Sequence, residues 1–254
     1  MVRVTMIPFI DIHCHLDYLQ DPEGAIKRAK EAGVGVILTN GVSPITNRKG
    51  LALAKTHPEV KAALGFYPPD ALEGFIFSER EFQEELAFIR ANKKHIRAIG
   101  EVGMDFKDGK DRELQGRVFV AMITLAKELD VPLLIHTRKA EELVLGLLDR
   151  EKPKKVILHC FCGKKALVKR ASDAGYCFSV PTNIVRAENF QQLVEMVPMC
   201  QLFCETDSPY LSPFKERPNE PAFVVESYKK IAEIKKLDLI EVKNLIYQNY
   251  QRLF

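Results

Sequence analysis

Short runs of apolar residues recur along the chain, and each is followed by a longer segment with helical periodicity. The runs are continuously apolar rather than alternating, which is typical of parallel strands that are buried on both faces. The pattern predicts eight strands, at residues 8–15, 34–39, 60–66, 96–102, 131–136, 156–161, 176–180 and 202–206.

The segments between these runs carry apolar residues at helical spacing with charges on the opposite face. We predict amphipathic helices at residues 22–32, 79–91, 111–129, 139–149 and 164–174, and a closing helix in the tail at 239–254. Eight such strand and helix units are the number that a (β/α)8 barrel, the TIM barrel, requires. The second architecture to consider is a doubly wound open sheet.

Polar residues at the ends of the predicted strands favour the barrel. His13 and His15 are separated by one residue, so on a strand both side chains point to the same side. In a barrel the carboxyl ends of all strands converge on one mouth, whereas in an open sheet strands one, four, five, six and eight could not all reach a common point. Six residues have this placement: His13, His15, Glu101, His136, His159 and Asp207.

Length and composition limit the classes of protein to which the chain belongs. Its 254 residues, with 46% hydrophobic and 28% charged, fit one globular domain that spans residues 1–254. The net charge of +3 is too small to indicate nucleic-acid binding by itself, so a polyanion site must be local. No run approaches the roughly 18 apolar residues of a membrane span, and no signal peptide is evident. We therefore expect a cytoplasmic protein with reduced cysteines and no membrane association.

The six polar residues at the strand ends have the chemistry of a metal site. Four imidazoles and two carboxylates are the nitrogen and oxygen ligands of a divalent-metal hydrolase. A carboxylate that bridges predicts two ions rather than one, and these ligands suit Zn²⁺, Mn²⁺ and, less well, Mg²⁺. His57 and His95 lie at the opposite ends of the strands, and we expect them only to cap helices or to face solvent.

Nearly the whole chain resembles the TatD-related deoxyribonucleases of the metal-dependent hydrolase superfamily. The resemblance depends on several motifs in the order of that family, because any one of them alone would be a weak signal. The motifs are residues 12–17 (IHCHLD), 98–105 (AIGEVGMD), 135–138 (IHTR), 158–161 (LHCF), 205–211 (ETDSPYL) and 219–221 (NEP), together with Arg112, Gln115 and Phe119.

The resemblance implies a role for each of the six polar residues. It implies that one ion is held by His13, His15 and Asp207, and the second by His136 and His159. Glu101 would bridge the two ions and so belong to the catalytic group. The implied activity is hydrolysis of DNA phosphodiesters, typically from the 3′ end, by a metal-bound hydroxide. We assign Asp207 as the residue that accepts the proton of the attacking water, and we expect Glu205 to support a ligand or line the barrel wall.

The chain departs from the family pattern at one position, and its phosphate-binding residues have to be predicted. The family usually has Gly-x-His-Pro after the third strand, whereas here Tyr67 stands at the histidine's position. Tyr67 keeps a hydrogen-bonding tip and an aromatic face, so we predict that it contacts a phosphate or a base. The predicted phosphate-binding cations are Arg138, Lys164 with Lys165 beside it, and Arg217.

Two other functions have to be considered beside a DNA-cleaving enzyme. Related barrels that open with His-x-His hydrolyse amides, lactones or small phosphoesters, and many of these bridge their metals with a carboxylated lysine at the fourth strand end. This chain has Glu101 there and no lysine until Lys107. A non-catalytic scaffold would be expected to have lost ligands, but all six are present. We therefore predict DNA as the substrate and two divalent ions as cofactors, with no obligate protein partner evident.

Overall fold

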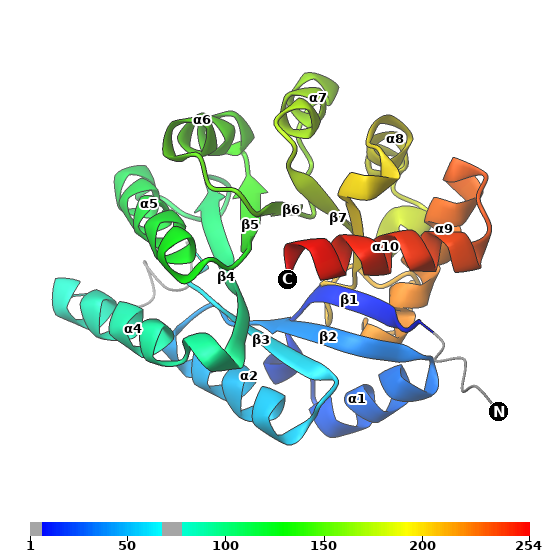
Figure 1. The fold of residues 1–254 in the computed structure, drawn as a ribbon, viewed down its shortest axis with the longest axis horizontal. Helices are drawn as coiled ribbons and strands as arrows, with labels where there is room; N and C mark the ends of the chain where they lie inside the picture. The colour runs from blue at the N-terminus through cyan, green and yellow to red at the C-terminus, as the bar shows by residue number, and fades with distance from the viewer. Residues whose placement is uncertain (1–6, 68–77) are drawn as a thin grey trace.

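Eight strands form the centre of the structure, a computed structural model that describes residues 7–67 and 78–254 (Figure 1). All neighbouring strands pair in parallel, and their order in the sheet is their order in the sequence. The strands are β1 (Phe9–Cys14), β2 (Val34–Asn40), β3 (Val60–Leu64), β4 (Ile96–Asp105), β5 (Leu133–Arg138), β6 (Val156–His159), β7 (Cys177–Pro181) and β8 (Leu202–Glu205).

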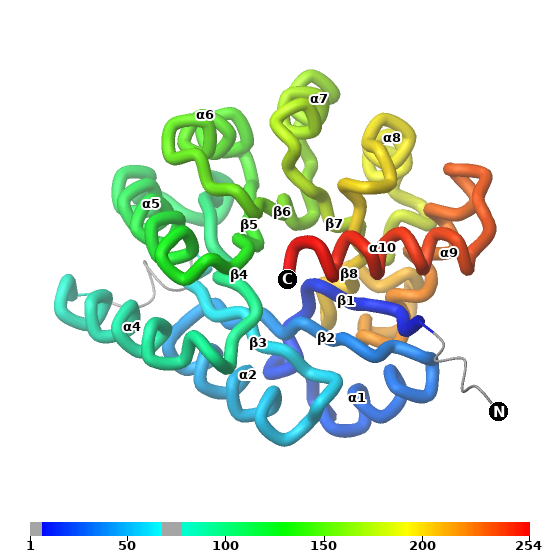
Figure 2. The backbone as a smooth tube through the Cα atoms, viewed as in Figure 1, coloured from blue at the N-terminus to red at the C-terminus, as the bar shows by residue number. Residues whose placement is uncertain are grey.

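The sheet closes where β8 meets β1, and the two lie side by side (Figure 2). Just beyond β8, the amide of Asp207 donates to the carbonyl of His13, and the amide of His15 donates to the carbonyl of Ser208, both at 2.8 Å. The structure is therefore the predicted (β/α)8 barrel, and the open-sheet alternative is wrong because an open sheet would leave these two edge strands apart.

Helices surround the barrel on its outside and follow the strands in turn (Figure 1). The five predicted amphipathic helices are confirmed to within two residues at each end, and the closing helix runs across the start of β8. The α-helices are α1 (Pro22–Glu31), α2 (Pro44–Thr56), α4 (Glu79–Ala91), α5 (Arg112–Leu129), α6 (Glu141–Glu151), α7 (Lys165–Asp173), α8 (Glu188–Met196), α9 (Val224–Lys235) and α10 (Leu239–Leu253). Short 3₁₀ helices are η1 (Leu16–Tyr18), η2 (Lys93–His95), η3 (Thr182–Val185), η4 (Met199–Gln201) and η5 (Pro221–Phe223).

Continuous burial explains why the strands read as unbroken apolar runs. Leu133, Leu134 and Ile135 of β5 are all fully buried, because one face of the strand lies inside the barrel and the other lies under the helices. Helix α10 packs against the amino-terminal end of β8, where Asn249 donates to the carbonyl of Leu202 at 2.9 Å. The carboxyl ends of the strands are left uncovered by this helix.

Most strands differ from the predicted boundaries by one to three residues, and the carboxyl ends of β4, β5 and β6 bear on the ligands; β5 runs to Arg138, two residues beyond its predicted end. Strand β4 continues three residues beyond the predicted end, because Asp105 still pairs with Arg138 of β5. Strand β6 ends two residues early, at His159, because Cys160 has a positive φ of 46° that turns the chain out of the sheet. The predicted ligands Glu101 and His136 therefore lie within their strands, and His159 is the last residue of its strand.

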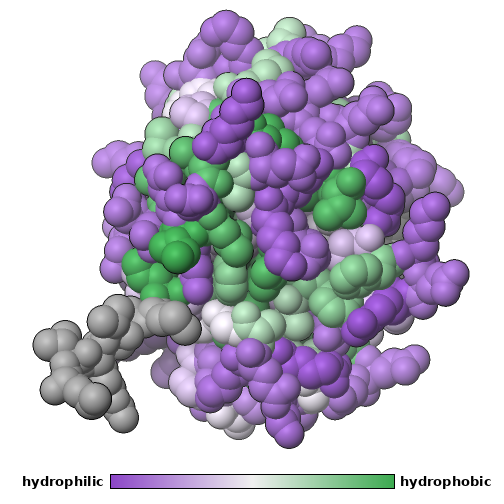
Figure 3. Space-filling model, turned by 90° about the vertical axis from the view of Figure 1, so that its right-hand side faces the viewer, coloured by the Kyte–Doolittle hydropathy of each residue, from purple (hydrophilic) through white to green (hydrophobic). Residues whose placement is uncertain are grey.

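The outer surface mixes hydrophilic and hydrophobic side chains. On the face seen in Figure 3, patches of hydrophobic side chains are separated by hydrophilic ones. None of the helices among residues 7–67 and 78–254 has the length and apolar character needed to cross a membrane.

Candidate metal centre

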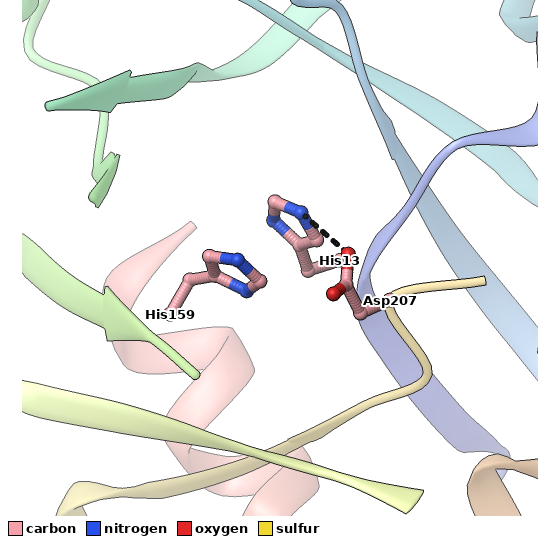
Figure 4. Close-up of side chains that lie close together, drawn as sticks. All are labelled: His13, His159 and Asp207. Carbon is pink, nitrogen blue, oxygen red and sulfur yellow. Dashed lines mark ion pairs between the residues drawn. The ribbon is translucent and has the colours of Figure 1, made fainter. Parts of the chain in front are cut away.

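All six predicted ligands lie together at the carboxyl ends of the strands. His13 and His15 come from the end of β1, and Asp207 comes two residues after β8. The other three belong to β4, β5 and β6, so the cluster unites five of the eight strands. Figure 4 shows the side chains of His13, His159 and Asp207 pointing toward one another from β1, β6 and the loop after β8. His13, His15, Glu101 and His159 are buried.

Four ligand atoms are spaced as the corners of a metal coordination sphere. The Nε2 atoms of His13 and His15 lie 3.3 Å apart, and they lie 3.4 and 3.3 Å from Oε2 of Glu101. Both nitrogens are 3.5 Å from Oδ1 of Asp207. A tetrahedral ion with ligands at about 2.1 Å separates its ligand atoms by about 3.4 Å. The spacing of these atoms therefore fits a divalent metal ion.

A second group of ligands faces the other oxygen of Glu101. Oε1 of Glu101 lies 2.9 Å from Nδ1 of His136 and 3.7 Å from Nε2 of His159. The ring of His159 stacks on that of His13 with centroids 3.7 Å apart, so the two groups are adjacent (Figure 4). One carboxylate thus presents a different oxygen to each group, which is the arrangement of a bridging ligand.

Hydrogen bonds to the remaining ring nitrogen orient His15 and His159. Nδ1 of His15 lies 3.0 Å from the carbonyl oxygen of Asn40, which can only accept a hydrogen bond, so Nδ1 carries the proton. Nδ1 of His159 lies 3.0 Å from Oε2 of Glu205 in the same way. The Nε2 atom of each ring is therefore the one with a lone pair available to a metal.

Glu205 is a buried residue of β8 that fixes the orientation of the His159 ring. Besides the imidazole, it accepts hydrogen bonds from the amide of Cys160 at 3.0 Å and from the hydroxyl of Ser179. Its side chain is fully buried. Every contact fixes the carboxylate in one orientation, so Glu205 positions His159 and does not itself reach the ligand cluster.

Asp105 contacts His136 as Glu205 contacts His159. We did not predict this role of Asp105 from the sequence. Its Oδ2 lies 3.1 Å from Nε2 of His136. The side chain of Gln115 makes two hydrogen bonds with the backbone of Asp105. Its Oε1 accepts from the backbone N–H at 2.9 Å, and its Nε2 donates to the backbone carbonyl at 3.0 Å. The available signal was an acidic residue four positions after Glu101 in an otherwise apolar strand.

Both cluster carboxylates are held in the ionised form. Burial alone would raise the pKa of Glu101, but hydrogen bonds with His13, His136 and His15 outweigh it and lower the pKa well below the usual value. Burial also acts to raise the pKa of Asp207. The hydrogen bond with His15 and the charges of the neighbouring imidazoles outweigh burial and lower the pKa. The buried Glu101 and the partly exposed Asp207 thus place two negative charges at one point, where they attract a cation.

The histidines respond to burial and to these carboxylates in different ways. Burial, followed by repulsion from His159, lowers the pKa of His13, which favours the neutral imidazole that binds metals. For His15 and His136 burial also acts to lower the pKa, but the hydrogen bonds with acidic neighbours outweigh it and raise the pKa. The Glu205 carboxylate likewise overcomes burial and raises the pKa of His159 to about 10. A divalent cation would take the place of these protons between the rings and the carboxylates.

The cluster opens into a hollow of about 360 Å³ that Tyr67 and Arg138 also line. The hydroxyl of Tyr67 donates to Oδ2 of Asp105 at 3.0 Å, and its ring meets His136 edge-on with centroids 4.9 Å apart. Burial and the nearby Asp105 raise the pKa of the Tyr67 hydroxyl, so it stays protonated. Nη1 of Arg138 donates to Asp108 at 2.6 Å at the same hollow.

The other predicted cations lie away from this hollow. Lys164 immediately precedes α7 and lines a different depression, together with Lys139 and Cys162. Arg217 lies in the loop between β8 and η5, where its guanidinium lies 4.4 Å from the ring centroid of Phe223. The structure therefore brings Tyr67 and Arg138 to the ligands and places Lys164 and Arg217 at the periphery. Their part in substrate binding stays a prediction.

Comparisons with known proteins agree with the fold and identify the family. The human protein named Deoxyribonuclease TATDN3 is 32% identical over 265 residues, covering 100% of this chain and 97% of its own. The 3'-5' ssDNA/RNA exonuclease TatD of Erwinia tasmaniensis is 31% identical over 252 residues, covering 93% of this chain and 95% of its own. The crystal structure of YJJV, a TatD homolog from Escherichia coli K12, has a TM-score of 0.88 and 27% identity and covers 98% of both chains. A model of the TatD related DNase family matches residues 10–254, and the chain therefore belongs to that family.

Proposed function

We propose that this protein hydrolyses phosphodiester bonds of DNA with two divalent metal ions and removes nucleotides from the 3′ end. The observation that carries the proposal is the convergence of six nitrogen and oxygen ligands around the two oxygens of Glu101. The names of the human and Erwinia relatives, a deoxyribonuclease and a 3'-5' exonuclease, support the substrate and the polarity. A cytoplasmic location stays a prediction from the sequence.

The residues divide between two ion positions. His13, His15 and Asp207 would hold one ion, His136 and His159 the other, and Glu101 would bridge them. When bound, a pair of divalent ions stabilises the negative charge that develops on the attacking and leaving oxygens and makes a water molecule acidic. Zn²⁺, Mn²⁺ and Mg²⁺ are the candidates, because they accept such ligands.

Asp207 is the residue best placed to accept a proton from the attacking water. Glu101 uses both oxygens within the cluster, and its side chain is only 4% exposed. Asp207 turns Oδ1 toward His13 and His15, and its side chain is 15% exposed at the wall of the hollow. Its lowered pKa keeps it ionised and ready to accept the proton.

Arg138 and Tyr67 would position the phosphate next to the ligands. The Arg138 guanidinium is suited to two phosphate oxygens, and it would have to exchange its contact with Asp108 for them. The Tyr67 hydroxyl donates a hydrogen bond to Asp105, so its oxygen remains able to accept one and its ring would pack against the nucleotide. Lys164 and Arg217 would contact only parts of the strand farther from the scissile bond.

Cleavage of end-labelled single strands tests the proposal. Strands labelled at the 3′ or the 5′ end are incubated with Mg²⁺, Mn²⁺ or Zn²⁺, beside RNA and small phosphodiesters. We expect early release of the 3′ label as a single nucleotide, which a Glu101→Gln variant should lose. Early release of the 5′ label would contradict the polarity. Absence of metal-dependent cleavage of any nucleic acid would overturn the proposed function, and turnover of small esters alone would favour the amidohydrolase-type alternative.

A further inference from the structure

Two cysteines that have no part in the proposed hydrolysis follow strand β6, in the turn that leads to α7 (Figure 1). Cys160 comes directly after the candidate ligand His159, and Cys162 stands two residues further along the chain. Both carry free thiols. Cys160 is partly buried, whereas Cys162 is exposed and lines the same depression as Lys164. A thiol that reagents reach from solvent therefore has a second, less accessible thiol beside it.

The turn folds Cys162 back onto Cys160. Cys160 has a positive φ of 46°, and the ring of Phe161 lies so near Gly163 that a Cβ atom there would overlap with it. The thiol of Cys162 donates to the carbonyl of Cys160 at 3.3 Å. The two side chains are also joined by a hydrogen bond between their thiols. The two sulfur atoms are therefore neighbours in the reduced protein.

The surroundings of Cys162 favour its thiolate, which is the form that attacks electrophiles. The hydrogen bond with the Cys160 thiol outweighs burial and, together with the charge of His159, lowers the pKa of Cys162 to about 7. The side-chain amide of Asn189 also donates to the Cys162 sulfur, at 3.6 Å. The charge of Glu141 acts in the opposite direction but does not cancel these effects. Roughly half of the Cys162 thiol is therefore ionised at neutral pH.

We propose that Cys162 is a thiol-modification site, which a hydroperoxide oxidises and which Cys160 then closes into a disulfide. The Cys162 sulfur attacks the outer oxygen of the hydroperoxide ROOH, so an S–O bond forms, the O–O bond breaks and ROH leaves. The Cys160 sulfur then attacks the resulting sulfenic acid, so the S–S bond forms, the S–O bond breaks and water leaves with the thiol proton. Two thiols are thereby oxidised while ROOH is reduced to ROH and water. An accessible thiolate beside a second thiol is the arrangement that this chemistry requires.

The other four cysteines do not combine these features. Cys14, Cys177 and Cys204 are buried, and burial raises the pKa of each of their thiols. Cys200 is exposed like Cys162. It therefore serves as the internal control for the effect of accessibility alone.

Peptide mapping tests the site. Protein loaded with Zn²⁺, which has no redox chemistry of its own, is treated with hydrogen peroxide and then with iodoacetamide. Trypsin releases residues 156–164 (VILHCFCGK), which hold Cys160 and Cys162 and no other cysteine. We expect this peptide to lose two hydrogen atoms and to resist alkylation, whereas Cys200 should be alkylated. A dithiol reductant should restore both thiols. If both thiols of the peptide stay open to alkylation while Cys200 is oxidised, the proposal is wrong.

Serine variants test the separate roles of the two thiols. In Cys160→Ser the sulfenic acid has no partner thiol, so dimedone, which captures sulfenic acids, should label Cys162. In Cys162→Ser the remaining Cys160 thiol should react with hydrogen peroxide roughly tenfold more slowly than the wild-type pair, because the accessible thiolate is gone. Cys200→Ser is the matched control at the other exposed position and should form the disulfide at the wild-type rate.

Two results would overturn these roles. Oxidation of Cys162→Ser at the wild-type rate would show that Cys162 is not the residue that reacts first. Absence of dimedone on Cys162 in Cys160→Ser would show that no sulfenic acid forms there. Circular dichroism of both variants verifies that they are folded, and Cys162→Ser changes only an exposed position.

Discussion

Three of the four histidines in the ligand cluster, His15, His136 and His159, are fixed through their second ring nitrogen. His159 has Nε2 toward Glu101 and Nδ1 on Glu205, while His136 has Nδ1 toward Glu101 and Nε2 on Asp105. Such outer contacts set which ring nitrogen carries the proton and how the ring points. At the scale of single residues, the centre depends on these supporting carboxylates as much as on the ligands.

Replacement of Asp207 tests the assignment of the base. We expect Asp207→Asn to reduce kcat roughly 10²–10⁴-fold, because the amide cannot accept the proton. The fold should persist, since Asp207 has a φ of 55° and asparagine tolerates this left-handed conformation. Circular dichroism and the melting temperature check the fold, and Asp173→Asn on α7 is a control. A fully active Asp207→Asn enzyme would refute the role.

Glu205→Gln tests the support of His159. The amide keeps the size of the side chain but removes the charge that orients Nδ1–H, so the affinity for the second ion should fall roughly 10–100-fold. Titration with Mn²⁺, followed by calorimetry, measures this without relying on turnover. Two sites with unchanged affinities would show that Glu205 serves only the barrel wall.

At the scale of secondary structure, strand β4 brings the bridging ligand to the centre by means of its glycines. Gly103 has a φ of 144°, and a Cβ atom there would overlap with the carbonyl of His136 on β5. Only glycine allows β4 and β5 to lie this close while both present a ligand. The placement of the ligands Glu101 and His136 therefore depends on the close approach of β4 and β5 at Gly103.

Two glycine replacements test this coupling. Gly103→Ala should lower the free energy of unfolding by about 1–3 kcal/mol or more and weaken metal binding, because the strands must separate. Gly146→Ala is the matched change, since no atom lies within 4 Å of an added Cβ in helix α6. It should raise the free energy of unfolding by about 0.5–1 kcal/mol. Urea unfolding of both variants measures the difference, and equal effects would argue against the close approach.

The loop after β8 closes the barrel and delivers Asp207. The fully buried Asp11 of β1 accepts hydrogen bonds from the amide and the hydroxyl of Thr206, at 2.9 and 2.6 Å. These contacts continue the β1 to β8 seam beyond the last residue of β8. The first and last strands are thereby locked together next to the ligands that they carry.

At the scale of the whole molecule, the ligand cluster connects strands that are distant in the sequence. It joins side chains from β1, β4, β5, β6 and the loop after β8, which are separated by nearly 200 residues of sequence. Ions bound only to the folded form therefore stabilise the complete barrel.

Metal removal tests this stabilisation. Chelation should lower the melting temperature, and re-addition of Zn²⁺ or Mn²⁺ at about 100 times Kd should restore about 2.7 kcal/mol for each independent site. The Glu101→Gln variant should show a smaller recovery, because both ions lose a shared ligand. Scanning calorimetry at several metal concentrations measures the effect, and a melting temperature independent of metal would contradict it.

The residue pattern was enough to predict the architecture of this protein and to bring its six candidate ligands into one group. Continuous burial makes each strand apolar throughout, and the carboxyl ends of parallel strands must share one rim, so local pattern was enough to group His13, His15, Glu101, His136, His159 and Asp207. Which residues support the ligands and which cations reach the hollow depends on the packing of elements. The contacts of Glu205 and Asp105 depend on the register between neighbouring strands, and Arg138 lines the hollow whereas Lys164 and Arg217 do not. Residue spacing does not encode those lateral positions, because they arise from packing between elements distant in the chain.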